Sequence, residues 1–72
     1  MTELARGHGL RGRVAEFDAA VGLGVIVDDE GRRYPFHCVE IADGSRDIAV
    51  GAVVRFDVLP KLGRYEAAAI RP

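Results

Sequence analysis

The sequence has little of what marks several common classes of protein. Its single cysteine, Cys38, has no second thiol with which to form an internal disulfide. No apolar run approaches the roughly 20 residues that a membrane-spanning helix needs. The first residues also lack the basic and apolar regions of a secretory signal. We therefore expect a cytoplasmic protein that does not bind a membrane.

Neither sign of charge is in excess. Ten basic residues stand against eleven acidic ones, which gives a formal net charge of -1. The whole molecule should therefore not attract polyanions, and any phosphate binding must come from a local patch. Arginine supplies all but one of the basic residues and is suited to bidentate phosphate contacts, although a GC-rich coding sequence would explain the same bias.

The length and composition fit one small globular domain. At 72 residues, a single core is adequate but marginal, and there is no room for a second domain. The hydrophobic share of 49% and the charged share of 29% lie well away from the composition of disordered chains. We expect the chain to fold alone, as a monomer.

Catalytic and metal-binding patterns are missing. The sequence offers no Ser, His and Asp constellation, no paired acids in a plausible cleft and no phosphate-binding loop. His37 and Cys38 are adjacent, but neighbours in a strand point to opposite faces and no second pair of metal ligands accompanies them. We expect a protein that is not an enzyme and holds no metal or other cofactor.

Strand patterns and turn signals alternate along most of the chain. Residues 1–9 show no period and predict a flexible tail, and residues 42–50 predict a loop with room for one helical turn. By propensity alone, Glu66 to Arg71 could also form a helix, but so short a helix is marginal. The predicted strands cover residues 10–17, 22–27, 33–39, 52–59 and 64–72.

Five short strands with turn-rich connections indicate a small all-β domain. A closed or partly closed antiparallel barrel would remove the exposed strand edges. The OB-fold, the SH3-like barrel and an open meander all fit this pattern, which does not by itself separate them.

The segment "GRVAEFDAAVGLGVI", residues 12–26, adds a more specific signal. It resembles the opening of the bacterial cold-shock domain, in which Gly, Val, Phe, an Asn or Asp, and Gly-x-Gly-x-Ile occur at these spacings. Later segments are similar too: "FHCVEI" to the second ribonucleoprotein motif and "EAAAI" to a closing Gln-Ala-Ala-Asn-Val. The resemblance covers residues 10–72 and implies a five-stranded antiparallel OB-fold that binds single-stranded RNA or DNA. The matched residues are Gly12, Val14, Phe17, Asp18, Gly22, Gly24, Ile26, His37, Ile41, Gly51, Val54 and Phe56.

The departures from the family lie where its members carry base-stacking aromatic rings. Glu16 takes the place of a tryptophan, and His37 is the one platform residue that remains. In contrast, the residues expected to face the barrel core are kept. The other aromatic positions hold Leu23, Val25, Pro35, Cys38 and Ser45. The expected core residues are Val14, Ile26, Phe36, Val54, Phe56 and Ile70.

The resemblance therefore implies single-stranded nucleic-acid binding that is weak and mainly electrostatic, because each lost stacking ring is worth roughly 1–3 kcal/mol. The implied contact residues are Arg13, Phe17, Leu23, Val25, Arg33 and His37. The alternative is a protein-interaction module that uses the apolar side chains of Leu23, Val25 and Pro35, since exposed apolar patches mark partner surfaces.

Four arginines near the ends of the first three strands have two interpretations: Arg11, Arg13, Arg32 and Arg33. They could form a phosphate-binding patch. The alternative, which we favour because surface charges usually contribute little to recognition, is that they offset nearby acids on a solvated surface.

Overall fold

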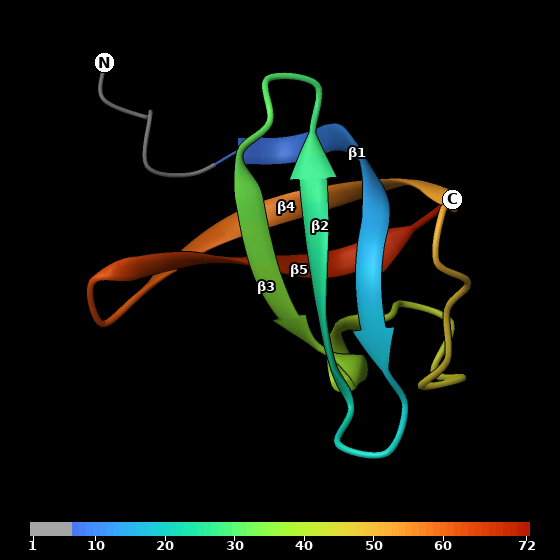
Figure 1. Cartoon of the computed structure of the whole chain (residues 1–72). Coiled ribbons are helices and arrows are strands. Elements are labelled where there is room, and N and C mark those ends of the chain that lie inside the picture. Colours follow the sequence, from blue (N-terminus) through green and yellow to red (C-terminus); the bar gives the residue numbers. More distant parts are fainter. Residues whose placement is uncertain (1–6) are drawn as a thin grey trace.

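The computed structural model describes residues 7–72 and contains five β-strands and one short 3-10 helix (Figure 1). The strands are β1 (Gly7–Asp18), β2 (Leu23–Asp28), β3 (Arg33–His37), β4 (Val53–Lys61) and β5 (Arg64–Arg71), with the 3-10 helix η2 (Cys38–Glu40) after β3. All neighbouring strands pair antiparallel, in the order β3-β2-β1-β4-β5. The predicted all-β fold with five antiparallel strands is confirmed.

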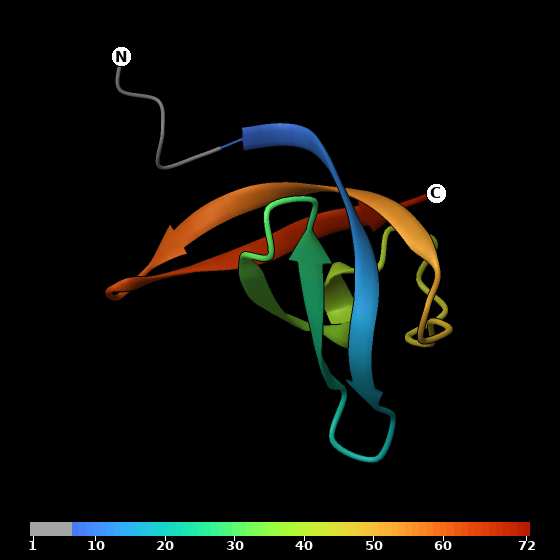
Figure 2. The same ribbon diagram turned by 45° about the horizontal axis from the view of Figure 1, so that its top comes forward.

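The sheet is strongly bent, and β1 makes the bend possible. The first half of β1 pairs with β4 and its second half pairs with β2. Consequently β1, β2 and β3 form one layer and β4 and β5 lie behind it, crossing at a steep angle (Figures 1 and 2). A single parallel bridge, Ile41 to Ile70, connects the segment after β3 with β5. Within residues 7–72 no continuous ladder joins β3 to β5, so a closed OB-type barrel stays a prediction.

Several boundaries differ from the sequence prediction. The first strand begins at Gly7, so the last three residues of the predicted tail belong to β1, while residues 1–6 lie outside the described part of the chain. The third strand ends at His37, because Cys38–Glu40 turn into η2. The loop over residues 42–50 has turns but no helix, and β4 continues through Pro60 to Lys61.

The last segment settles the choice between helix and strand. Arg64–Arg71 forms β5 and pairs with β4, so the helical alternative for Glu66 to Arg71 is excluded. Pro35 is also accommodated, because β3 is an edge strand and its missing N–H need not serve a second neighbour. The part of the chain that the structure describes has no helix of the length and apolarity that a membrane crossing requires.

The core lies between the two layers and confirms the predicted inward positions. All six predicted core side chains are buried: Val14, Ile26, Phe36, Val54, Phe56 and Ile70. Tyr34, Ile41, Val58 and Ala67 complete the apolar cluster, in which the Tyr34 and Phe56 rings lie 5.1 Å apart at a tilted angle. Burying these side chains supplies the hydrophobic stabilisation that a chain of this size needs.

A bulge at Ala15 decides which side chains of β1 face outward. Val14 pairs with Ile26 and Glu16 pairs with Val25, so Ala15 is an extra residue without its own partner. Strict alternation would put Glu16 on the same side as Val14. The bulge shifts the alternation by one residue, so Val14 and Phe17 both point into the core and Glu16 points to solvent.

Candidate functional site

The outward side chains of β1, β2 and β3 meet in three cross-strand rows. From β1 to β3 these rows are Arg13, Val27 and Arg33; Glu16, Val25 and Pro35; and Asp18, Leu23 and His37. We call these nine residues the outer face. Side chains directly opposite each other in a sheet lie close enough to touch, so each row is a continuous strip that a ligand could contact.

The structure brings five of the six predicted contact residues together on the outer face: Arg13, Leu23, Val25, Arg33 and His37. Phe17 lies on the opposite side of the sheet. It pairs with Gly24, packs against the core and stacks on Phe36 with ring centroids 6.0 Å apart and planes within 1° of parallel. We therefore leave Phe17 out of the interface.

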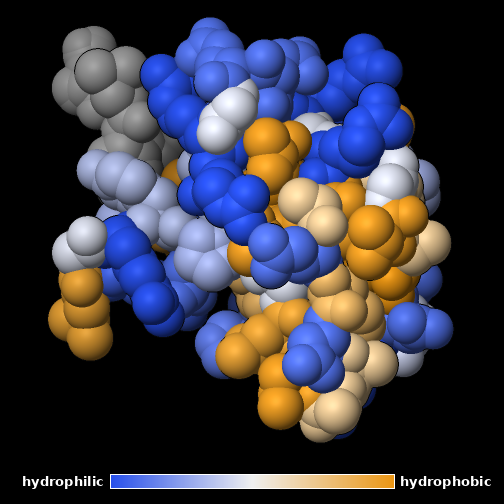
Figure 3. Space-filling view, viewed as in Figure 1, coloured by the Kyte–Doolittle hydropathy of each residue, from blue (hydrophilic) through white to orange (hydrophobic). Residues whose placement is uncertain are grey.

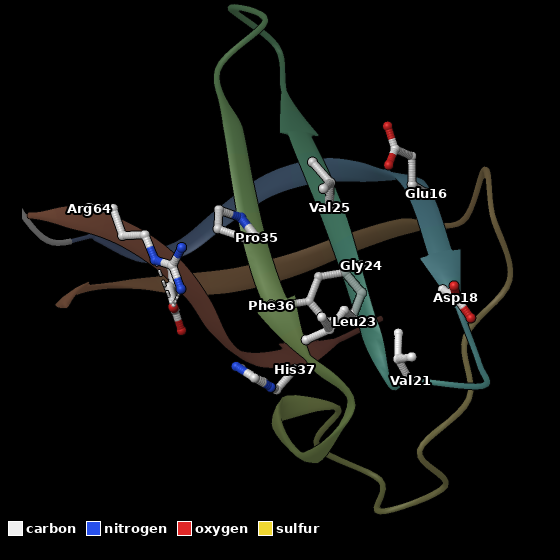
Figure 4. Close-up of a pocket in the computed structure, with 11 residues that line it drawn as sticks. Glu16, Asp18, Val21, Leu23, Gly24, Val25, Pro35, Phe36, His37 and Arg64 are labelled. Carbon is white, nitrogen blue, oxygen red and sulfur yellow. Dashed lines mark hydrogen bonds and ion pairs between the residues drawn. The ribbon is translucent and has the colours of Figure 1, made fainter. Parts of the chain in front are cut away.

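A shallow groove of about 400 Å³ runs over two rows of the outer face, the row that begins at Glu16 and the row that begins at Asp18. Its floor is apolar, with Leu23, Val25 and Pro35 side by side, and Val21 stands at its end (Figure 4). Val21 is 64% exposed and Leu23 is 45% exposed, so these side chains are open to solvent. Figure 3 shows hydrophobic residues gathered over the lower half of this layer, with hydrophilic residues around the β2–β3 turn.

The two glycines of "VGLGVI" shape the sheet beneath this floor. A Cβ on Gly24 would lie 2.5 Å from Phe36 Cζ and 2.7 Å from the Glu16 carbonyl oxygen, so only glycine lets the Phe36 ring cover the strand (Figure 4). Gly22 has a φ of +74° and would meet Cys38 Sγ at 2.8 Å. Gly24 therefore has a packing role within its strand, and Gly22 has a packing and backbone role in the turn before β2.

The charged residues of the outer face largely offset one another. Arg33 Nη2 donates to Glu16 Oε2 at 2.8 Å, and both side chains are more than half exposed. Asp18 is occupied in the β1–β2 turn, where its Oδ1 accepts a hydrogen bond from the Ala20 N–H at 3.0 Å. The guanidinium of Arg13 has no carboxylate partner within residues 7–72 and donates to the Gly51 carbonyl oxygen at 3.1 Å.

The hairpin between β4 and β5 contributes cations that the sequence pattern did not indicate. Arg64 lines the same groove as His37 (Figure 4), and Lys61 joins both around an adjoining hollow of about 720 Å³. The buried Glu66 carboxylate forms ion pairs with both cations. Its Oε2 lies 3.0 Å from Arg64 Nη2, and its Oε1 lies 3.8 Å from Lys61 Nζ. The alternation of Arg64 and Glu66 was visible in the sequence, but nothing showed that this hairpin lies beside β3.

The predicted phosphate patch does not form as one unit. Arg32 is held within the β2–β3 turn by Glu30 and Asp28, and Arg33 is held by Glu16. Only Arg11 and Arg13 of that set have no carboxylate partner in the described residues. For Arg32 and Arg33, the structure therefore agrees with the second interpretation: their charges offset nearby acids on a solvated surface.

No group of three or more His, Cys, Asp or Glu side chains within residues 7–72 is arranged to hold a metal ion. Cys38 is half-buried on η2 and packs against the core. Comparison of the sequence with known protein families and with curated proteins finds no match. The functional argument therefore depends on the geometry of the outer face and the hairpin beside it.

Proposed function

We propose that this protein binds single-stranded nucleic acid across the outer face, weakly and with a large electrostatic share. The observation that carries the proposal is the groove itself, which runs over β2 and β3 and ends at His37 and the Arg64 and Lys61 cations of the β4–β5 hairpin. OB-folds bind oligonucleotides over their second and third strands and the loop between the fourth and fifth. The groove occupies the corresponding elements.

The strand order supports an OB-type arrangement for this proposal. In the sheet β3-β2-β1-β4-β5, a long bent β1 pairs with both β2 and β4. The parallel bridge between Ile41 and Ile70, together with the hydrogen bond from the Ala42 N–H to the Ile70 carbonyl at 2.8 Å, draws the two edges toward each other. We propose that the domain is a partly open barrel of this kind.

The chemistry of the groove sets the expected strength of binding. Apolar side chains can contact the faces of bases, but they lack the rings that make stacking worth roughly 1–3 kcal/mol per base. Glu16 and Asp18 repel phosphates, and Arg64 and Lys61 attract them although both are paired with Glu66, while the neutral His37 ring can donate a hydrogen bond to a phosphate oxygen. Phosphate contacts should therefore dominate, and affinity should fall steeply as salt is raised.

The test is a titration of the isotope-labelled protein with an oligothymidine of about six nucleotides, within the site size of one OB-fold. We expect amide shift changes concentrated on β2, β3 and the β4–β5 hairpin. Val21→Asp places a carboxylate at the end of the groove and should weaken binding. Val39→Asp is the matched control, because Val39 is also 64% exposed and does not line the groove. Equal effects of the two variants, or a tight complex insensitive to salt, would contradict the proposal.

A second candidate function is a protein-interaction module. It is favoured by the apolar floor of the groove, in which Leu23 is exposed and Val25 and Pro35 are half-buried. The same titration separates the two functions, because a protein-binding face should show no amide shifts with oligonucleotide at low salt.

A further inference from the structure

A second charged surface lies on the other half of the sheet, where β1 pairs with β4 and β4 pairs with β5. Arg11 is directly opposite Arg55, and Arg55 is directly opposite Arg71. Arg13 lies two residues further along β1, opposite Val53 on β4. We call Arg11, Arg13, Arg55 and Arg71 the arginine face. Figure 2 shows the elements that carry it, with the first half of β1 alongside β4 and with β5 beyond.

The arginine face carries more positive charge than its own acids can offset. Within residues 7–72, Asp57 is its one carboxylate partner, and Asp57 is engaged by Arg71 at 3.2 Å, by the Gly9 N–H at 2.8 Å and by His8 at 3.7 Å. Among the described residues, the side chains of Arg13 and Arg55 donate only to backbone carbonyls, those of Gly51 and Gly9 respectively. Hydrogen bonds to neutral carbonyls leave these two guanidinium charges uncompensated.

This arrangement has a cost for the folded protein. Like charges directly opposite each other in a sheet are destabilising, and here three arginines follow one another across three adjacent strands. The rest of the molecule is acidic in compensation, since the net charge of the whole chain is -1. Local concentration of guanidinium groups is the pattern that recognises phosphate, because the planar fork matches its oxygens.

We infer that the arginine face binds the phosphate backbone of the same nucleic-acid strand after it leaves the outer face. This inference rests on the proposed function. Arg13 connects the two surfaces, since it pairs with Val27 on the side of the outer face and with Val53 on the side of the arginine face. A single strand that passes over Arg13 can therefore follow the bend of β1 from one surface to the other. The contacts are to phosphates, so they add affinity without sequence preference.

The test compares oligothymidines of about six and about twelve nucleotides, lengths within the range that one OB-fold covers. Arg11→Gln/Arg55→Gln removes two charges of the arginine face. We expect this variant to lose roughly threefold or more in affinity for the long strand, while affinity for the short strand changes little. The salt dependence for the long strand should also weaken, by about 0.7 in the logarithmic slope for each lost contact.

The single variant Arg11→Gln has a charge-matched control in Arg46→Gln. Arg46 is exposed on the loop after η2 and, like Arg11, has no carboxylate partner in the described residues. If Arg11→Gln and Arg46→Gln have the same effect on the long strand, the inference fails while the proposed function stands. If long-strand binding needs Arg11 and Arg55 but is indifferent to Val21→Asp, the nucleic acid lies on the arginine face alone and the proposed function fails instead. Absence of binding by either strand at low salt overturns both.

Discussion

At the scale of single residues, Ala69 has a backbone conformation that alanine rarely adopts. Its φ is +51°, in the left-handed region. The cause is a bulge in β5: Asp57 pairs with Ala68 and Arg55 pairs with Arg71, so Ala69 is an extra residue on its strand. The Ala69 N–H donates instead to Glu40 Oε1 at 3.3 Å. A left-handed alanine costs roughly 1–2 kcal/mol, so this position stores strain.

Replacing Ala69 with asparagine should stabilise the protein. Asparagine tolerates the left-handed conformation better than alanine does, because its short polar side chain can hydrogen-bond locally. We expect Ala69→Asn to raise the free energy of unfolding by about 0.5–1 kcal/mol, measured as a higher midpoint of urea unfolding. Ala68→Gly, at a buried neighbour with an extended backbone, should lower the midpoint. A lower midpoint for Ala69→Asn would show that the bulge imposes no strain on alanine.

At the scale of the element, the turn between β2 and β3 is organised by one carboxylate. Asp28 Oδ1 accepts hydrogen bonds from the N–H groups of Glu30 and Arg32, each at 2.9 Å, and Oδ2 accepts one from the Tyr34 hydroxyl at 3.0 Å. Partial burial acts to raise the pKa of Asp28, but these hydrogen bonds and the nearby Arg32 charge outweigh it and hold the pKa below its ordinary value of 3.8. The ionised carboxylate therefore stabilises the hairpin.

The sign of the pH dependence follows from that lowered pKa. The stabilisation by Asp28 is fully present above the ordinary pKa of 3.8 and is lost as the pH falls through the lower pKa of the folded state. We expect Asp28→Asn to cost about 1–2 kcal/mol near neutral pH. The difference from the original protein should shrink when urea unfolding is measured below pH 3.8. A difference that is constant across this range would mean that the charge of Asp28 has no part in the turn.

The elements also show what the sequence could and could not reveal. The strand segments and the inward core residues were predictable, because alternating apolar residues such as Val54, Phe56 and Val58 give a direct signal of a half-buried strand. The bulge at Ala15 was not, because nothing in "RVAEF" distinguishes a bulged strand from a regular one, and the outward position of Glu16 came only from the family resemblance. The ending of β3 at His37 was likewise hidden, since Cys38 and Val39 continue its apolar pattern.

The candidate site was partly predictable for a related reason. Residues on β1, β2 and β3 could be grouped from the order of the strands, and they share the outer face. The Lys61 and Arg64 cations could not be added, because their place beside His37 depends on how the β4–β5 hairpin lies against β3. Similarly, the arginine face depends on cross-strand register, which relates Arg11 to Arg55 over a long sequence separation.

At the scale of the whole molecule, charge and apolar surface are distributed on different halves of the outward side of one bent sheet. The outer face offers an apolar groove with offset charges, and the arginine face offers guanidinium groups with one carboxylate partner among the described residues. The net charge of -1 for the whole chain does not reveal this separation, because it sums the charges of both halves of the sheet. Three of the positions where the sequence resemblance predicts stacking rings lie together in the groove: Glu16 pairs with Val25, and Leu23 lies one row further along.

That arrangement allows a test by restoration rather than loss. The triple variant Glu16→Trp, Leu23→Phe and Val25→Phe exchanges one carboxylate and two aliphatic side chains for rings on adjacent rows of the outer face, and it also releases Arg33 from its ion pair with Glu16. At roughly 1–3 kcal/mol for each stacked base, it should bind a short oligothymidine at least about tenfold more tightly, measured by fluorescence titration at fixed salt.

Glu16→Gln, which removes the charge and adds no ring, separates the two effects: we expect it to gain less than the triple variant and to lose its gain at high salt, where charge effects are screened. The comparison requires that both variants keep the amide spectrum of the original fold. A folded triple variant with unchanged affinity would mean that the rows of Glu16, Val25 and Leu23 are not a nucleic-acid surface. The apolar floor of the groove would then be better explained as a protein contact. Rings added to a surface that contacts bases should raise its affinity for an oligonucleotide.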